Sequence, residues 1–143
     1  MAEHGRSRET KASPEVVWGI WSDEATWRTW NPDVVSIMLD GPFQSGTTGK
    51  MTTKAGGTHS IRLDNVKVGR AFDLVTSPAP LSTFHFKCRV EPTRTGSRIA
   101  QAVAMSGPLG GVFSALMGER IAAGFEGILA GLAGAAETLP RGA

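Results

Sequence analysis

The sequence changes its apolar period at Pro108, and this change constrains the fold more than any other feature. Between Val34 and Met105, apolar side chains recur at every second residue within short segments, which is the spacing of one strand face. Beyond Pro108 they recur at intervals near three, four or seven, the spacing of one helix face. This helical stripe comprises Leu109, Phe113, Leu116, Ile121, Phe125, Ile128, Leu132 and Leu139. We therefore predict an α+β chain in which an antiparallel meander precedes one long C-terminal helix.

The region with the period of two divides into six predicted strands separated by turns rich in glycine and proline. The strands cover residues 34–40, 49–55, 58–68, 70–76, 81–92 and 97–105. In 81–92, Phe84 and Phe86 fall on one face while His85 and Lys87 fall on the other, so we expect one apolar and one solvated face. The last strand has small side chains on one face, over which we expect the final helix to lie. They are Ala100, Ala102 and Ala104.

All four tryptophans of the chain fall between Val17 and Pro32. Ser13 is suited to cap a helix that has Pro14 at its first position, and residues 23–30 predict a second short helix that ends before Pro32. The polar lead-in should form the first strand, although it lacks alternating aliphatic residues. We expect it to be an exposed edge that is frayed over residues 1–8.

Length and composition are those of one globular domain spanning residues 1–143, with residues 140–143 also frayed. Hydrophobic residues make up 41% of the chain and charged residues 20%, which argues against disorder. The net charge is only +2 and the basic residues are scattered, so we expect no nucleic-acid partner. The single cysteine, Cys88, and three separated histidines show no zinc-binding spacing, so we expect no metal and no cofactor.

The chain shows no signal peptide and no membrane-spanning run. Its N-terminus is polar, and its most apolar stretch is interrupted by Glu119, Arg120 and Glu126. We therefore expect a cytoplasmic protein without an integral membrane segment.

Four segments carry a resemblance to a known family. Residues 13–32, "SPEVVWGIWSDEATWRTWNP", resemble the opening of polyketide cyclase/dehydrase-like members of the SRPBCC (START-like) superfamily, with Trp21 in place of a more usual leucine. The positions that match are Trp18, Trp27, Trp30, Asn31 and Pro32. The resemblance continues through residues 40–51, 90–99 and 106–118. It implies the helix-grip fold, a curved antiparallel sheet of about six or seven strands wrapped around a long C-terminal helix, with two short helices after the first strand.

The resemblance also implies a cavity between the sheet and the long helix. Combined with the apolar pattern, it predicts a ligand-binding set of Phe72, Leu74, Phe84, Phe86, Phe113, Met117, Phe125 and Leu129. The alternative is that these side chains fill a solid core. The matching tryptophans are expected to be packing residues. Trp21 is expected either to form a wall near the cavity or to fill more of the core.

Few polar residues are candidates for chemistry. His59 shares a strand face with Ile61 and Leu63 and is a weak catalytic candidate, with a surface or structural histidine as the alternative. Arg62 and Asp64 point the opposite way, toward solvent. Arg70 and Asp73, like Arg62 and Asp64, could supply an oxyanion partner or a general base, with a solvated face as the alternative. His85 is expected on the outer surface and Cys88 as an inert buried thiol.

These residues predict a protein that binds a hydrophobic small molecule such as a polyketide, lipid or isoprenoid. One alternative is a polyketide aromatase/cyclase or dehydratase, which the complete absence of tyrosine weakens because one common proton donor is missing. Another is an interaction protein that regulates a partner through its surface.

The long helix also carries glycines along one flank: Gly124, Gly127, Gly131 and Gly134. Each disfavours a helix by about 1 kcal/mol relative to alanine. Close packing against a neighbouring segment or the second subunit of a homodimer would explain them, as would a helix loosened for ligand entry or simple composition drift.

Overall fold

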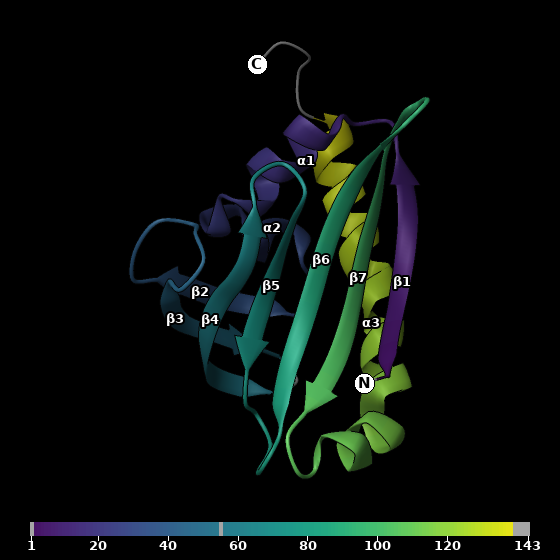
Figure 1. Ribbon diagram of the computed structural model, residues 1–143. Helices are drawn as coiled ribbons and strands as arrows, with labels where there is room; N and C mark the ends of the chain where they lie inside the picture. Colours follow the sequence, from purple (N-terminus) through teal and green to yellow (C-terminus); the bar gives the residue numbers. More distant parts are fainter. Residues whose placement is uncertain (1, 55, 139–143) are drawn as a thin grey trace.

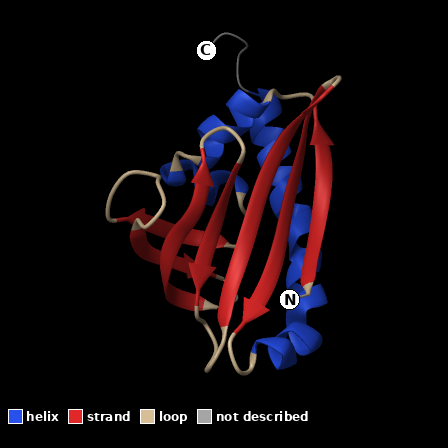
Figure 2. Ribbon diagram, in the orientation of Figure 1, coloured by secondary structure: helices blue, strands red, loops and turns tan. Residues whose placement is uncertain are grey.

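The computed structural model describes residues 2–54 and 56–138 and contains one sheet and one long helix (Figures 1 and 2). The seven strands are antiparallel and lie in the order β1-β7-β6-β5-β4-β3-β2. The strands are β1 Glu3–Thr10, β2 Val34–Leu39, β3 Thr48–Thr53, β4 Gly57–Lys67, β5 Ala71–Thr76, β6 Thr83–Thr93 and β7 Gly96–Ser106. The helices are α1 Pro14–Trp21, a 3-10 turn Glu24–Thr26, α2 Trp27–Trp30 and α3 Gly110–Thr138. The predicted meander, the two short helices and the long final helix are confirmed.

Helix α1 begins as the sequence predicts. The Ser13 hydroxyl accepts a hydrogen bond from the backbone N–H of Val16 at 3.3 Å, and Pro14 occupies the first helical position. Helix α2 ends at Trp30, and Asn31 is already extended before Pro32. These short helices cover one end of the sheet and lie next to α3 in Figure 1.

From Glu3 to Thr10 the lead-in is a regular strand, so the expectation of fraying is corrected for residues 3–8; Met1 and residues 140–143 lie outside the described residues. Each residue of β1 has a register partner in β7, and β1 packs against α3 through polar side chains rather than aliphatic ones. His4 Nδ1 and Arg6 Nη2 lie 3.1 and 3.2 Å from the Glu119 carboxylate. Farther along the strand, the Thr10 hydroxyl donates to Glu137 at 2.6 Å. Because α3 supplies these partners, β1 needs no apolar alternation.

The alanine face of β7 lies on the outer side of the sheet, so the prediction that the final helix covers it is wrong. Ala102 is in register with Lys87 of β6 and Gly5 of β1, all on the side away from α3. Lys87 Nζ lies 2.6 Å from the Glu3 carboxylate on β1, and both strands are neighbours of β7. The small side chains of β7 therefore leave room for an ion pair that spans this strand.

A dense aromatic core fills the end of the interior beneath α1 and α2. Trp18, Trp21 and Trp27 are 9%, 2% and 5% exposed. Their rings contact Phe72 with centroid distances of 6.2, 5.4 and 6.0 Å, and Phe43 reaches the same ring at 5.1 Å. These edge-to-face and tilted pairs add stabilisation beyond simple burial. The prediction that the tryptophans pack the fold is therefore supported by a ring cluster centred on Phe72.

The glycines of α3 differ in what surrounds them. A Cβ at Gly131 would overlap the carbonyl oxygen of Trp30, and one at Gly118 would overlap the His4 ring. A Cβ at Gly124 or Gly134 would meet no atom within 4 Å. Close packing within the chain therefore explains Gly131, whereas Gly124 and Gly134 face open space.

Candidate functional site

A cavity of about 540 Å³ lies between α3 and the inner face of the sheet. Some residues that line it are also solvent-exposed, so they mark its opening: Gly56, Pro78, Arg120 and Gly124. On α3 the lining positions are spaced one, three, one and three apart, so they form a single helix face. They are Arg120, Ile121, Gly124, Phe125 and Ile128.

Five of the eight predicted ligand-binding side chains line this cavity. Phe72 and Leu74 come from β5, Phe84 and Phe86 from β6, and Phe125 from α3. The alternation of the strands places these side chains on the inner face, and α3 meets them through its apolar stripe. The ring centroids of Phe86 and Phe125 lie 6.2 Å apart, so sheet and helix touch within the lining.

The other three predicted residues do not line the cavity. Phe113 and Met117 lie one to two turns before the lining face of α3 and pack against a small cluster that includes Val103 and Met105. Leu129 is 1% exposed and belongs to the core that contains the tryptophans. Periodicity identifies which side of a helix is buried, but it does not show where along that side the interior is hollow.

Three tryptophans, expected to be scaffold or left unplaced, also form part of the cavity wall. Trp21, Trp27 and Trp30 all line it, whereas Trp18 does not. The indole N–H of Trp27 donates to the Trp21 carbonyl at 2.9 Å, and that of Trp30 donates to the Thr26 hydroxyl at 3.1 Å. With these two donors already engaged, the Trp27 and Trp30 indoles present an apolar surface to the cavity. For Trp21 the sequence signal was a tryptophan at a position where the family that this segment resembles more usually has leucine.

The ionisable residues of the cavity are concentrated near its opening. His59 lies on the inner face of β4 together with Ile61 and Leu63, as predicted, and it is half-buried. Asp33 and Arg120 also line the cavity. Arg62 and Asp64 form an ion pair of 3.0 Å on the opposite face, in agreement with their predicted orientation.

Cys88 and Gln101 line the cavity from adjacent register positions on β6 and β7. Burial raises the pKa of the Cys88 thiol well above its ordinary value, so this group stays protonated at neutral pH. Gln101 does not titrate. This part of the cavity therefore has no side chain that exchanges a proton near pH 7.

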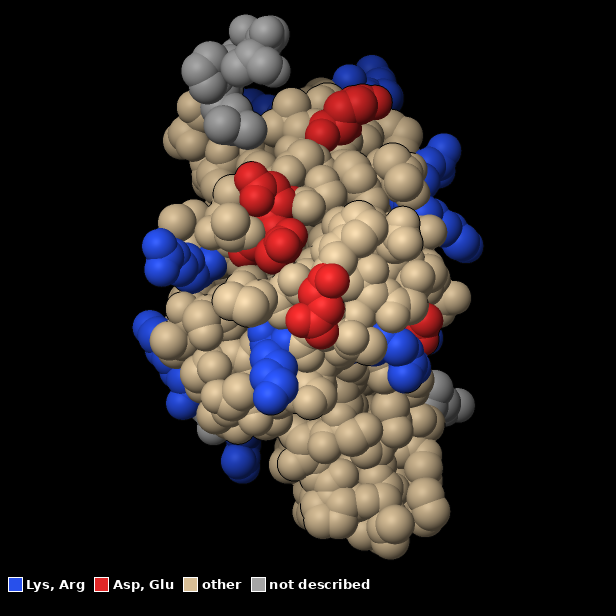
Figure 3. Space-filling model, turned by 90° about the vertical axis from the view of Figure 1, so that its left-hand side faces the viewer, with Lys and Arg blue, Asp and Glu red and all other residues tan. Residues whose placement is uncertain are grey.

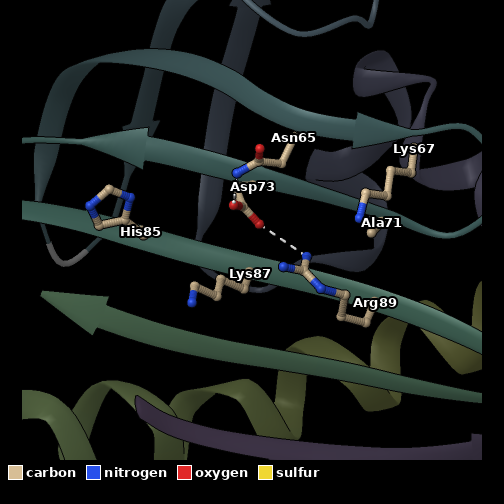
Figure 4. Close-up of a pocket in the computed structure, with 7 residues that line it drawn as sticks. All are labelled: Asn65, Lys67, Ala71, Asp73, His85, Lys87 and Arg89. Carbon is tan, nitrogen blue, oxygen red and sulfur yellow. Dashed lines mark hydrogen bonds and ion pairs between the residues drawn. The ribbon is translucent and has the colours of Figure 1, made fainter. Parts of the chain in front are cut away.

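A second, smaller hollow of about 390 Å³ lies on the outer face of the sheet (Figure 4). At its base the Asp73 side chain is only 5% exposed, although the sequence suggested a solvated position. Arg89 Nη1 donates to Asp73 at 3.0 Å and Asn65 Nδ2 donates to it at 2.8 Å. Asn65 has a positive φ of 49° where β4 is irregular. Asp73 therefore holds this irregular segment in place. His85 lies on the outer face, as predicted.

Charge is unevenly distributed over the surface. Figure 3, which views the side of β2 to β4, shows basic and acidic side chains interspersed over most of the face and none at the lower end. No Lys, Arg, Asp or Glu occurs between Asp73 and Lys87 or between Arg98 and Glu119, the stretches that include the β5–β6 connection and the start of α3. The helices within residues 2–54 and 56–138 include none long and apolar enough to span a membrane.

Solved structures share this fold along nearly the whole chain. XoxI from Bacillus cereus is 19% identical with a TM-score of 0.76, and the alignment covers 96% of this chain and 97% of XoxI. Ara h 8.0201 is 17% identical with a TM-score of 0.69, covering 96% and 99%. DynU16, from the dynemicin biosynthetic locus, is 15% identical with a TM-score of 0.73, covering 95% of this chain and 47% of DynU16. At these identities the likeness establishes the helix-grip fold alone.

No match is found among curated proteins. The family model described as "Polyketide cyclase / dehydrase and lipid transport" matches residues 1–137. The match agrees with the resemblance carried by the tryptophan segment and with the seven-stranded sheet around a long helix. The chain therefore belongs to the polyketide cyclase/dehydrase and lipid transport family.

Proposed function

We propose that this protein binds a hydrophobic small molecule of the polyketide, lipid or isoprenoid kind in the cavity between α3 and the sheet. The observation that carries the proposal is the cavity itself, about 540 Å³ in volume and walled mainly by aromatic and aliphatic side chains. Ligand sites of this kind are concave, mostly apolar and provided with few polar groups. The family description joins polyketide cyclases and dehydrases with lipid transport, and these activities share a largely apolar molecule as cargo or substrate.

The test is native mass spectrometry of the protein purified from its own host, compared with two variants. Gly124 lines the cavity and Gly134 does not, yet a Cβ at either position meets no atom within 4 Å. Gly124→Leu should therefore place an apolar side chain in the opening, and Gly134→Leu is its matched control on the same helix. We expect an apolar ligand on the wild type and on Gly134→Leu, with reduced occupancy on Gly124→Leu. A wild type that binds nothing, either from its host or from a panel of lipids and polyketides, would contradict the proposal.

A second candidate is polyketide cyclisation or dehydration in the same cavity. It is supported by the presence of both His59 and Asp33 in the lining, because an imidazole and a carboxylate can accept and return protons during an aldol closure and water loss. The test is to incubate a poly-β-ketone thioester analogue with wild type, His59→Gln and Asp33→Asn and to measure products by mass spectrometry. An enzyme should lose most of its rate in at least one variant. Equal product profiles with and without protein would contradict the cyclisation or dehydration hypothesis, and ligand binding would remain as the proposed function.

A further inference from the structure

Gln101 is a polar interruption in the apolar inner face of β7. It lies between Ile99 and Val103, both of which have no exposed surface, and its side chain lines the cavity. Its register partners are Cys88 on β6 and Arg6 on β1. An apolar residue would continue the pattern of this strand, so the amide requires a physical explanation.

Within the described residues, no side-chain or backbone group forms a hydrogen bond with the Gln101 amide. Two indoles and one hydroxyl of the lining are engaged: the Trp27 and Trp30 indoles donate to protein oxygens, and the Thr76 hydroxyl donates to the Ser60 carbonyl at 2.9 Å. An amide carries two donors and an acceptor, and Gln101 is half-buried, so water can reach these groups while the cavity is empty. A ligand that displaces this water without replacing its hydrogen bonds loses affinity. The cavity is the space from which a partner can reach this amide.

We propose that Gln101 recognises a neutral oxygen, a ketone or a hydroxyl, carried within the apolar body of the ligand. The inference rests on the proposed binding function and specifies the class of ligand. The amide N–H can donate to a ketone oxygen, and a hydroxyl can in addition donate to the amide oxygen. A saturated hydrocarbon would cover the amide without satisfying it, so the ligand is an oxygenated chain or ring system rather than a plain acyl chain.

The charges around Gln101 favour a neutral group over an acid. Arg6, the neighbour on β1, already has Glu119 at 3.2 Å and Glu126 at 3.4 Å. The register neighbours of Gln101 therefore offer no free cation to a carboxylate placed beside it, and the other cation of the lining, Arg120, is solvent-exposed at the opening. Cys88 on the other side is a protonated thiol and only a weak hydrogen-bonding group.

The position of Gln101 in the sheet separates it from the histidine near the opening. His59 is on β4, and β5 and β6 lie between β4 and β7. Three interstrand spacings correspond to roughly 14 Å along the sheet. A ligand oxygen that meets Gln101 is thus distinct from any polar group of the same ligand that reaches His59.

The experiment uses octadecanoic acid and a series of its derivatives with one hydroxyl or ketone at successive chain positions. Dissociation constants are measured by displacement of a fluorescent naphthalene sulfonate from wild type, Gln101→Leu and the control Gly134→Leu. For the wild type we expect the best oxygenated probe to bind about five- to tenfold more tightly than octadecanoic acid, the gain typical of one hydrogen bond. The control should keep this preference, and Gln101→Leu should lose it.

Thermal unfolding of the empty proteins separates ligand recognition from a structural role. Because the side-chain amide of Gln101 makes no hydrogen bond within the described residues, Gln101→Leu should keep or raise the wild-type Tm. A flat position profile in the wild type, or an unchanged preference in Gln101→Leu, would overturn the assignment of Gln101 while leaving binding in the cavity intact. Failure of the wild type to bind every probe would instead contradict the proposed function.

Discussion

The two ends of the interior use the same kinds of side chains but differ in how completely they are filled. Beneath α1 and α2, Trp18 and its neighbours surround Phe72 and leave the ring 1% exposed. Beneath α3, Phe86 and Phe125 also make an aromatic contact, yet they border a cavity of about 540 Å³. At the first end rings from several elements converge on Phe72, whereas at the second the facing side chains of α3 and the sheet leave space between them. Phe72, Trp21 and Trp27 belong to both regions, because they form the packed ring cluster and also the wall of the cavity on that side. Trp18 lies behind this wall and serves the packed core alone.

The largest expected effect is the contrast between Trp18→Ala and Phe86→Ala. Trp18 lies only in the filled core, so its truncation should lower the free energy of unfolding by about 3–5 kcal/mol, as in other tightly packed cores. Phe86 already borders empty space, so its loss should cost about 1–3 kcal/mol, the transfer contribution of an aromatic side chain. Urea denaturation measures both values.

Ligand binding gives the same contrast in reverse. Phe86→Ala should weaken the binding of an apolar probe, whereas Trp18→Ala should bind normally under conditions in which it remains folded. If Trp18→Ala kept the wild-type stability but no longer bound the probe, the assignment of Trp18 to packing rather than to ligand binding would be wrong.

The next largest effect concerns the close contact between α3 and the end of α2. Gly131→Ala should destabilise the protein by about 1–3 kcal/mol, because its Cβ overlaps the Trp30 carbonyl oxygen and the helix must move. Gly134→Ala should stabilise it by roughly 0.5–1 kcal/mol, because alanine favours the helix and meets nothing there. Thermal and urea unfolding of this pair test the contact directly. Equal stabilisation by both would show that α3 is not pinned at Trp30.

The smallest effect concerns the polar attachment of α3 to β1. Hydrogen bonds from His4 and Arg6 hold the pKa of Glu119 below its ordinary value of 4.5. A carboxyl with a lowered folded-state pKa contributes stability above its unfolded pKa and loses it as the pH falls through the folded value. The stability difference between wild type and Glu119→Gln should therefore shrink as the pH decreases below about 4.5. Melting curves between pH 7 and pH 3 measure it, and a constant difference would contradict the attachment.

The sequence predicted the order of elements and the inner and outer faces of the strands because apolar period reports which side of each element is buried. It did not predict how far the cavity extends along α3, so Phe113 and Met117 were placed in the lining and Trp27 and Trp30 were not. The outer position of Ala102 was also missed, since small side chains fit equally under a helix or beneath a spanning ion pair. Gln101 could have been found as the polar residue between Ile99 and Val103.

The pairing of β1 has a consequence for the time at which the protein can fold. His4 and Glu119 are 115 residues apart in the chain, and β7, the strand that pairs with β1, ends only at Ser106. During synthesis β1 emerges before its partner and must remain unpaired until β7 has also left the ribosome. Contacts between such distant segments slow folding, because a long loop has to close before they form. The sheet should therefore be completed late, after the β2–β6 meander has formed its local hairpins.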